Sequence, residues 1–163
     1  MIRKATSHDI DQVEKCIIER LEYEQVHGAY TSWKLNIYPT RETAEKALFD
    51  GSLYVMEQDC DIYAIIIASR NQPPKFDYIE WKYLAQPDEV FVINLLCVRP
   101  SKSRRGIGKT VVRFIIEEAK NMGCKTVRLD TGRKNTPAIA LYTGIGFELT
   151  GSNENFLFYE LKI

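Results

Sequence analysis

The sequence lacks an excess of charge of either sign. Its 163 residues carry 22 basic and 22 acidic side chains, so the formal net charge at pH 7 is zero. Proteins that bind nucleic acids or anionic membrane surfaces generally carry a strong positive bias. The balance therefore argues against nucleic-acid and membrane partners, and any cluster of cations in this chain is a local feature.

Cysteine and histidine are scarce and scattered. The four cysteines are Cys16, Cys60, Cys97 and Cys124. They form no C-x-x-C pair, and the two histidines, at positions 8 and 27, stand far from each other. Zinc ligands usually come in closely spaced Cys and His pairs, so we expect no bound metal.

Long apolar runs are also missing. No segment reaches the ~18 apolar residues of a membrane-spanning helix, and the first residues do not show the regions of a signal peptide. Scattered, unpaired thiols are common in reducing compartments. Together these features lead us to expect a cytoplasmic protein that does not act at a membrane.

The hydrophobic pattern predicts one mixed α/β domain over residues 1–163. Apolar residues recur at helical spacing from Ile10 to Leu21, which predicts a helix ending near Glu22. Further helices are expected from about 40 to 50, from 107 to 122 and after 135. Strands are expected at residues 2–5, 53–57, 62–69, 90–98 and 124–130, near 147, and at 156–161. The predicted order is thus β, α, α, β, β, β, α, β, α, β, β.

The segment SRRGIGKT, residues 103–110, lies between an expected strand and an expected helix. Its last residues resemble the end of a P-loop, but Ser103 stands where that motif has its first glycine. A second interpretation is a site for the pyrophosphate of a coenzyme. The free N–H groups of a helix start favour an anion, and glycines allow close approach of the backbone. A glycine-containing basic loop alone does not decide between these interpretations.

A second segment extends the pattern. The strand end LCVRP, Leu96 to Pro100, precedes the loop SRRGIG, Ser103 to Gly108, and NTPAIALYTGIGF follows at Asn135 to Phe147. The combination resembles the GNAT superfamily of acyl-CoA N-acyltransferases, whose signatures are L-x-V-x-P with [Q/R]-x-x-G-x-[G/A], and N-x-x-A-x-x-L-Y-x-x-x-G-F. The specific part of the resemblance covers residues 90–148, and Ser103 departs from the family's Gln or Arg.

The resemblance implies a fold, a cofactor and a set of cofactor contacts. The implied fold is a mixed, mostly antiparallel central sheet of about six to seven strands, flanked by about four helices. The implied cosubstrate is acetyl-CoA, with its pantetheine arm on the main chain of the central strand and its pyrophosphate on the glycine loop. The implied contacts are Leu96, Cys97, Val98, Arg104, Arg105, Gly106, Ile107, Gly108, Lys109 and Asn135.

The resemblance also implies a mechanism. Tyr142 corresponds to the general acid that protonates the departing thiolate, with a packed helix residue as the structural alternative. Cys97 is more simply a small core residue than a nucleophile, because no histidine is paired with it. The general base for the amine is not identified: Glu80, Glu89 and Asn94 are the candidates, and both glutamates have an ordinary solvated role as the alternative.

The function implied is transfer of the acetyl group of acetyl-CoA to a primary amine of a small molecule or peptide, by direct attack in a ternary complex. The alternative is a non-catalytic domain that binds or senses acyl-CoA. Aromatic residues of the two irregular stretches either form an acceptor pocket or fill the core; these are Tyr30, Trp33, Tyr38, Trp81 and Tyr83. Homodimers are frequent in the family, and the acceptor itself is not encoded in any motif.

Overall fold

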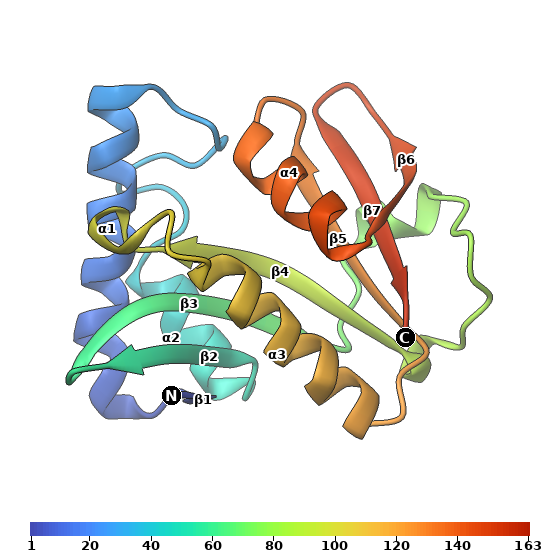
Figure 1. Ribbon diagram of the computed structural model, residues 1–163, viewed down its shortest axis with the longest axis horizontal. Coiled ribbons are helices and arrows are strands. Elements are labelled where there is room, and N and C mark those ends of the chain that lie inside the picture. Colours follow the sequence, from blue (N-terminus) through green and yellow to red (C-terminus); the bar gives the residue numbers. More distant parts are fainter. The chain divides into compact units, whose positions relative to one another are not determined.

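The computed structural model describes every residue, 1–163. The helices are α1 (Ile10–His27), α2 (Arg41–Phe49), α3 (Ile107–Asn121) and α4 (Thr136–Ile145). The strands are β1 (Ile2–Lys4), β2 (Leu53–Gln58), β3 (Asp61–Ser69), β4 (Val90–Val98), β5 (Thr126–Gly132), β6 (Glu148–Ser152) and β7 (Phe156–Lys162). This is the predicted order of elements (Figure 1). None of the helices is long and apolar enough to cross a lipid bilayer.

The strands form a seven-stranded sheet in the order β1-β2-β3-β4-β5-β7-β6. Strands β4 and β5 pair in parallel, whereas the β1–β2, β2–β3, β5–β7 and β6–β7 ladders are antiparallel. The predicted fold class, a mixed and mostly antiparallel sheet with four helices, is therefore confirmed.

Two compact units divide the chain, and each is described by itself. Unit 1 comprises residues 1–67 and 95–111, and unit 2 comprises residues 68–94 and 112–163. The division falls inside β3, β4 and α3, so these three elements contribute to both units. Unit 1 contains the glycine loop, and unit 2 contains Tyr142.

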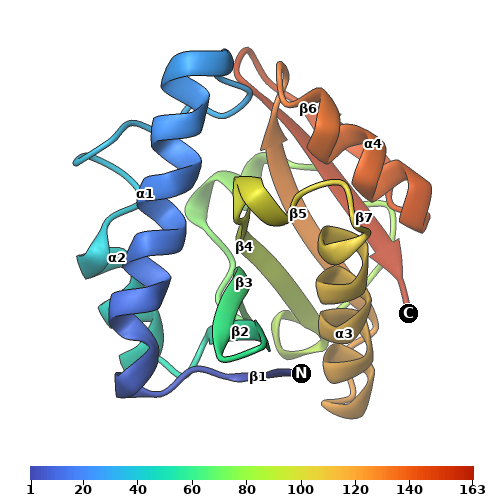
Figure 2. The ribbon, with the colours of Figure 1, turned by 60° about the vertical axis from the view of Figure 1, so that its left-hand side comes forward.

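The core of unit 1 lies between α1 and the strands. Helices α1 and α2 lie side by side (Figure 2). Apolar side chains of α1 pack with those of α2, β2, β3 and the end of β4. From α1 this core includes Val13, Cys16 and Ile17, and from the strands it includes Leu53, Ile65 and Cys97. Their spacing along α1 is the helical period seen in the sequence, which explains why this helix could be predicted.

Helix α1 is longer than predicted and ends at His27 rather than near Glu22. Gly28, with φ of 96°, ends the helix, and its N–H donates to the Glu24 carbonyl at 3.0 Å. The prediction stopped early because the apolar helical pattern is lost from Tyr23 onward, where the sequence looks like an aromatic-rich loop. In the structure Glu24 lies on the buried face of the helix and is 5% exposed.

A buried ion pair organises unit 2. Arg128 on β5 and Glu160 on β7 are cross-strand partners, with Nε and Oε1 2.9 Å apart and both side chains buried. Arg128 also donates to the Gln72 side chain and to the Tyr83 carbonyl, and the Tyr83 N–H donates to Glu160. The Arg128 guanidinium lies over the ring of Trp81, 4.4 Å from its centroid. The pair thus fixes the irregular segment 70–88 to the sheet.

Replacing Arg128 with Met should destabilise the protein by about 3–5 kcal/mol, because it leaves the Glu160 carboxylate buried without a cation. The measurement is urea unfolding of Arg128→Met beside the wild type. Lys120→Met is the control, because the Lys120–Glu117 pair is exposed and should contribute about 1 kcal/mol or less. Equal stability losses for the two variants would contradict this role of the buried pair.

Candidate functional site

The end of β4 is less covered than its beginning. Its ladder with β5 runs from Val90 to Ile93, and residues 94–98 lie beyond these four pairs. In that last stretch Leu95 and Cys97 are buried in the core of unit 1, whereas Asn94 is exposed and Leu96 and Val98 are half-buried. Main-chain groups beyond the ladder remain available to a ligand that binds as an added strand would.

The glycine loop has the backbone geometry of an anion site. Arg104 and Gly106 have φ values of 63° and 74°, which turn the chain before α3 begins at Ile107. The first helical N–H with an intrahelical partner belongs to Thr110, which donates to the Gly106 carbonyl at 3.0 Å. The N–H groups of residues 107–109 therefore have no partner within the helix and can receive an anion.

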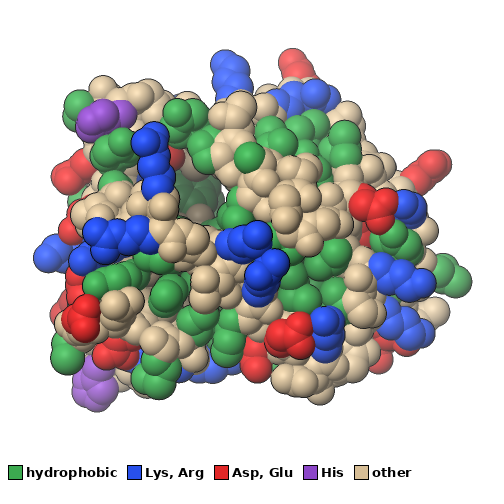
Figure 3. All heavy atoms as spheres, viewed as in Figure 1, with side chains coloured by type: hydrophobic (Ala, Val, Ile, Leu, Met, Phe, Trp, Pro, Cys, Tyr) green, Lys and Arg blue, Asp and Glu red, His purple; other side chains and the backbone are tan.

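The cations of this loop are free to contact a ligand. Arg104, Arg105 and Lys109 are exposed, and none of them forms an ion pair within the protein. Ile107 in contrast is 7% exposed and anchors the start of α3. Across the face seen in Figure 3, basic and acidic side chains are interspersed, in keeping with the zero net charge. The unpaired cations of the loop are thus a local feature, as the composition predicted.

Arg20 of α1 connects the end of β4 to the glycine loop. Its guanidinium donates to the Val98 carbonyl, at 3.1 Å from Nε and 2.5 Å from Nη2, and to the Ser103 hydroxyl at 3.1 Å. Ser103 in turn donates to the Arg99 carbonyl at 3.3 Å. The serine that departs from the family signature therefore has a bracing role. No sequence motif pointed to Arg20.

The buried side chain of Arg99 also holds the end of β4 in place. It is 4% exposed and forms ion pairs with Glu19 of α1, at 3.1 Å, and with Asp61 of β3, at 2.5 Å. Its backbone N–H donates to the Tyr63 carbonyl at 2.9 Å. The loop is consequently attached to both α1 and β3 before the glycines are reached.

Cys97 is a core residue, as its lack of a histidine partner suggested. It is 1% exposed, and its Sγ lies 4.0 Å from Sγ of Cys16 on α1. The hydrogen bond to Cys16 and burial raise the pKa of the Cys97 thiol well above its usual range. The thiolate needed for nucleophilic attack is therefore disfavoured at this position.

Tyr142 and Asn135 lie on α4 in unit 2. The ring of Tyr142 is 5% exposed and meets Phe147 edge to face, with centroids 5.7 Å apart. Burial, with a smaller contribution from the Asp130 charge, raises the pKa of Tyr142 far above its usual value, so its hydroxyl keeps its proton. Asn135 caps α4, because its side chain accepts from the Ala138 N–H at 3.3 Å.

The candidate bases differ in their surroundings. Glu89 forms an ion pair with Lys125 at 2.6 Å and accepts from the Gln86 N–H. These two contacts, the lysine first, lower the pKa of Glu89 and make it a weaker base. Glu80 is exposed, as is Asn94. Glu80 therefore fits the solvated alternative, whereas Glu89 is half-buried and held by its ion pair with Lys125.

The five aromatic residues differ in their contacts and in their exposure. Trp81 packs with Phe76 and Phe158, and Trp33 packs against the core of unit 1. Tyr83 donates its hydroxyl to Glu148. Tyr30 and Tyr38 are 46% and 45% exposed, so part of each ring lies at the surface. The tryptophans fit the core-filling alternative.

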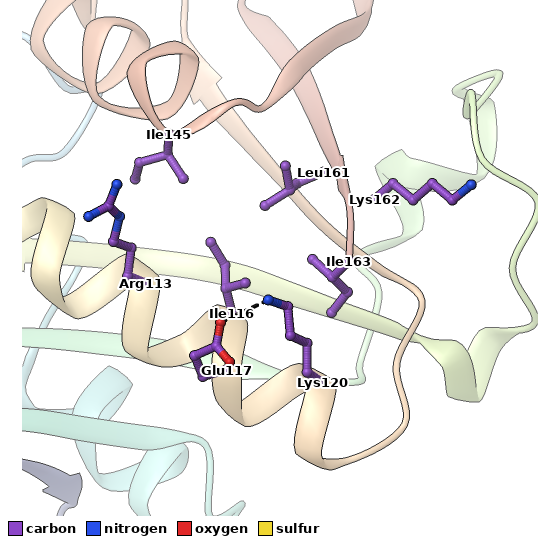
Figure 4. Close-up of a pocket in the computed structure, with 8 residues that line it drawn as sticks. All are labelled: Arg113, Ile116, Glu117, Lys120, Ile145, Leu161, Lys162 and Ile163. Atoms are coloured by element: carbon purple, nitrogen blue, oxygen red, sulfur yellow. Dashed lines mark hydrogen bonds and ion pairs between the residues drawn. The ribbon is translucent and has the colours of Figure 1, made fainter.

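A separate hollow of about 640 Å³ lies in unit 2 (Figure 4). It contains none of the predicted site residues, and its lining comes from α3, the end of α4 and the end of β7. The lining residues are Arg113, Ile116, Glu117, Lys120, Ile145, Leu161, Lys162 and Ile163. No group of three or more metal-ligating side chains is found in the chain.

Comparison with known proteins identifies the family. The sequence model described as the Acetyltransferase (GNAT) family matches residues 19–147. The chain therefore belongs to the GNAT acetyltransferase family, which confirms the resemblance seen in the two motifs.

Relatives of this chain match less than half of its length. The N-acetyltransferase YvbK of Bacillus subtilis is 31% identical over 71 residues, 44% of this chain and 45% of that protein. The [ribosomal protein bS18]-alanine N-acetyltransferase of Salmonella typhimurium is 33% identical over 69 residues, 42% of this chain and 46% of that protein. The matched stretches thus span just under half the length of these relatives.

Solved structures with the same fold cover the whole chain. A GNAT-family acetyltransferase from Streptococcus agalactiae has a TM-score of 0.87 at 20% identity, covering 100% of this chain and 95% of that one. The PaiA N-acetyltransferase of Thermoplasma acidophilum, solved with coenzyme A, has a TM-score of 0.72 at 16% identity, covering 100% and 98%. At these identities the likeness establishes the fold.

Replacing Arg20 with Met should expose the glycine loop to proteolysis. Hydrogen bonds to a charged group contribute about 1.5–3 kcal/mol, so local opening should rise by about tenfold or more. The measurement is the rate of tryptic cleavage after Arg104 and Arg105, followed by mass spectrometry. Arg41→Met is the control, because Arg41 pairs with Asp11 and Glu14 of α1 and with Glu45 of α2, and none of these pairs involves the glycine loop. Unchanged cleavage in Arg20→Met would show that the loop holds its shape without this brace.

Proposed function

We propose that this protein is a single-domain N-acetyltransferase that moves the acetyl group of acetyl-CoA to a primary amine of a small molecule or peptide. The observation that carries the proposal lies in unit 1. The end of β4, beyond its ladder with β5, is followed along the chain by the start of α3, whose free N–H groups can bind an anion, and Arg20 connects the two. A thioester on a long phosphorylated carrier needs both features. The names of the relatives, which include an alanine N-acetyltransferase, agree with an amine acceptor.

The proposed cofactor contacts follow from this geometry. The main chain of Leu96, Cys97 and Val98 pairs with the pantetheine arm, and a backbone N–H of this stretch donates to the thioester carbonyl. The N–H groups of residues 104–109 receive the pyrophosphate, and the side chains of Arg104, Arg105 and Lys109 add charge-assisted hydrogen bonds. Asn135, whose side chain already caps α4, contributes its remaining amide hydrogens.

The proposed reaction is a direct displacement. The neutral amine attacks the thioester carbonyl, a C–N bond forms, and the negative charge on the carbonyl oxygen is held by the backbone N–H of β4. The C–S bond then breaks, Tyr142 gives its proton to the leaving thiolate, and the nitrogen releases one proton to solvent, from which Tyr142 regains its own. The raised pKa of Tyr142 keeps a proton on the hydroxyl across the working pH range, and it also makes the hydroxyl a weaker acid than an ordinary tyrosine.

Acetyl-CoA should raise the thermal stability of the wild type, and Mg-ATP should not. Ligand at a hundred times Kd adds ~2.7 kcal/mol, which for a chain of this size is a Tm rise of roughly 5–11 °C. The measurement is thermal unfolding with each ligand and without ligand. A rise with Mg-ATP alone would sink the acyltransferase proposal and favour the P-loop interpretation.

The same assay assigns the loop cations. The triple variant Arg104→Ala, Arg105→Ala, Lys109→Ala should lose most of the rise, because it removes the free charges that face the pyrophosphate. A control of equal charge change neutralises three exposed lysines elsewhere, Lys15, Lys46 and Lys120. If both triple variants lose the rise equally, net charge rather than the loop is responsible.

Replacing Tyr142 with Phe should lower kcat most near neutral pH and less above about pH 8.5, where a thiolate no longer needs a proton. The pKa of Tyr142 is raised, so in the wild type the hydroxyl stays protonated beyond about pH 10, the usual tyrosine value, and kcat should not decline through its ionisation below that pH. The measurement is kcat against pH with amines. Tyr159→Phe, at another buried tyrosine, is the control. A loss in Tyr142→Phe that is equal at all pH values would point to packing instead.

A further inference from the structure

The proposed reaction starts from a neutral amine, so it leaves the extra proton of the ammonium form without a recipient. A primary amine with a pKa near ~10.4 is mostly protonated at pH 7, and even a peptide α-amino group, at ~7.7–8.0, is largely so. Glu89 is already paired with Lys125, and Glu80 is exposed. A carboxylate that is close to the end of β4 and free of a cation partner is therefore needed, and unit 1 contains one.

Glu24 stands in a row of α1 residues that faces the end of β4. Positions four apart on a helix lie on one face, and Cys16, Arg20 and Glu24 are so spaced. Cys16 meets Cys97 at 4.0 Å, and Arg20 bonds to the Val98 carbonyl. Glu24 is the next member, about 6 Å further along the helix axis. Its negative charge contributes to the raised pKa of Cys97, which agrees with a position beside this strand end.

No cation neutralises Glu24. Its side chain is buried, and Oε2 accepts from the Thr31 hydroxyl at 2.6 Å and from the Thr31 N–H at 3.4 Å. Arg20, one turn earlier, is occupied by Val98 and Ser103. Other titratable groups on the surrounding elements include Cys97 of β4, His27 of α1, and Tyr30, Lys34 and Tyr38 of the 28–38 loop. Neither His27 nor Lys34 forms an ion pair with Glu24, and the His27 ring contacts the Tyr23 carbonyl instead. A buried carboxylate without a counter-charge is a strong attractor for a ligand cation.

The loop over Glu24 has the character of an acceptor site. Thr31 attaches this loop to α1, and Trp33 packs into the core of unit 1 beside it. Tyr30 and Tyr38 of the same loop are about half exposed, at 46% and 45%. An aromatic surface next to a carboxylate suits an ammonium group carried on an apolar body.

We infer that Glu24 is a catalytic residue of the proposed acetyl transfer, which binds the acceptor's ammonium group and takes its proton. The inference rests on the proposed function. One N–H proton passes to the Glu24 carboxylate, and the freed nitrogen lone pair forms the C–N bond to the acetyl carbon. The C–S bond breaks, Tyr142 protonates the thiolate, and the nitrogen releases its second proton to solvent, from which Tyr142 regains its own. Glu24 returns its proton to solvent before the next cycle.

The test is the pH profile of kcat/KM with acetyl-CoA and a tripeptide that has a free N-terminal alanine. The wild type takes the ammonium form, so its profile should be flat from about pH 6 to about pH 7.5. Glu24→Gln must take the neutral amine, so its kcat/KM should be about 10²–10⁴-fold lower at pH 7 and should rise about tenfold per pH unit up to the amine pKa of ~7.7–8.0.

Two variants separate this role from a structural one. Glu22→Gln changes an exposed carboxylate on the same helix and should match the wild type. Thr31→Val removes the hydroxyl bond of the loop but keeps the carboxylate, so its profile should stay flat whatever its rate. A Glu24→Gln profile as flat as that of the wild type, or a kcat/KM within about threefold of it, would overturn the inference.

The acetyl-CoA thermal shift distinguishes the two levels of the proposal. Glu24→Gln should keep the wild-type rise in Tm, because the pyrophosphate loop is intact. A loss of the rise in this variant would mean that Glu24 supports the cofactor site rather than the acceptor, and would overturn the inference while leaving the acyltransferase proposal standing. A wild type that shows no rise would overturn both.

Discussion

The attachment of α1 to the end of β4 is the constraint on which unit 1 depends. Past Ile93 the strand has left its ladder with β5, and its remaining residues are held from one side by α1. Arg20 binds a main-chain carbonyl there instead of a carboxylate, and β3 is the neighbouring strand on the other edge, so the edge beyond the β5 ladder is the one that a ligand can approach. A strand end held in this way is rigid and yet open, and those are the two properties that a thioester site requires.

In unit 2, a buried ion pair holds an irregular segment in place. The only regular structure in the segment 70–88 is short 3-10 turns, which begin at Pro74 and at Pro87. Regular structure therefore cannot supply hydrogen-bond partners for most of its backbone N–H and carbonyl groups. Arg128 and Glu160 supply donors and acceptors to that segment from inside the sheet. The irregular stretch can therefore be long without being loose, and aromatic side chains such as Trp81 fill the space that it encloses.

The sequence allowed the order of elements, the family and the glycine loop to be predicted, because each is written in local spacing. Apolar periodicity located α1 and α3, and the two motifs located the loop and α4. The roles of Arg20 and Glu24 could not be predicted in this way. Their significance comes from facing β4, some 70 or more positions away in the chain, and a charged residue at a core position looks like the end of a helix. Ser103 likewise stands out in the sequence only as a departure from the family signature, whereas in the structure its hydroxyl accepts a hydrogen bond from Arg20.

The bracing of Ser103 by Arg20 has a further consequence for the energetics of the loop. A flexible glycine loop loses conformational entropy when it closes on an anion, and that loss weakens the affinity. Here the shape of the loop is already imposed by α1 in the folded protein, so the loss is incurred during folding. Helix α1, which carries Glu24 on the acceptor side, thus also affects how tightly the pyrophosphate end of acetyl-CoA is bound. Substitutions in α1 would alter the binding of both substrates at once.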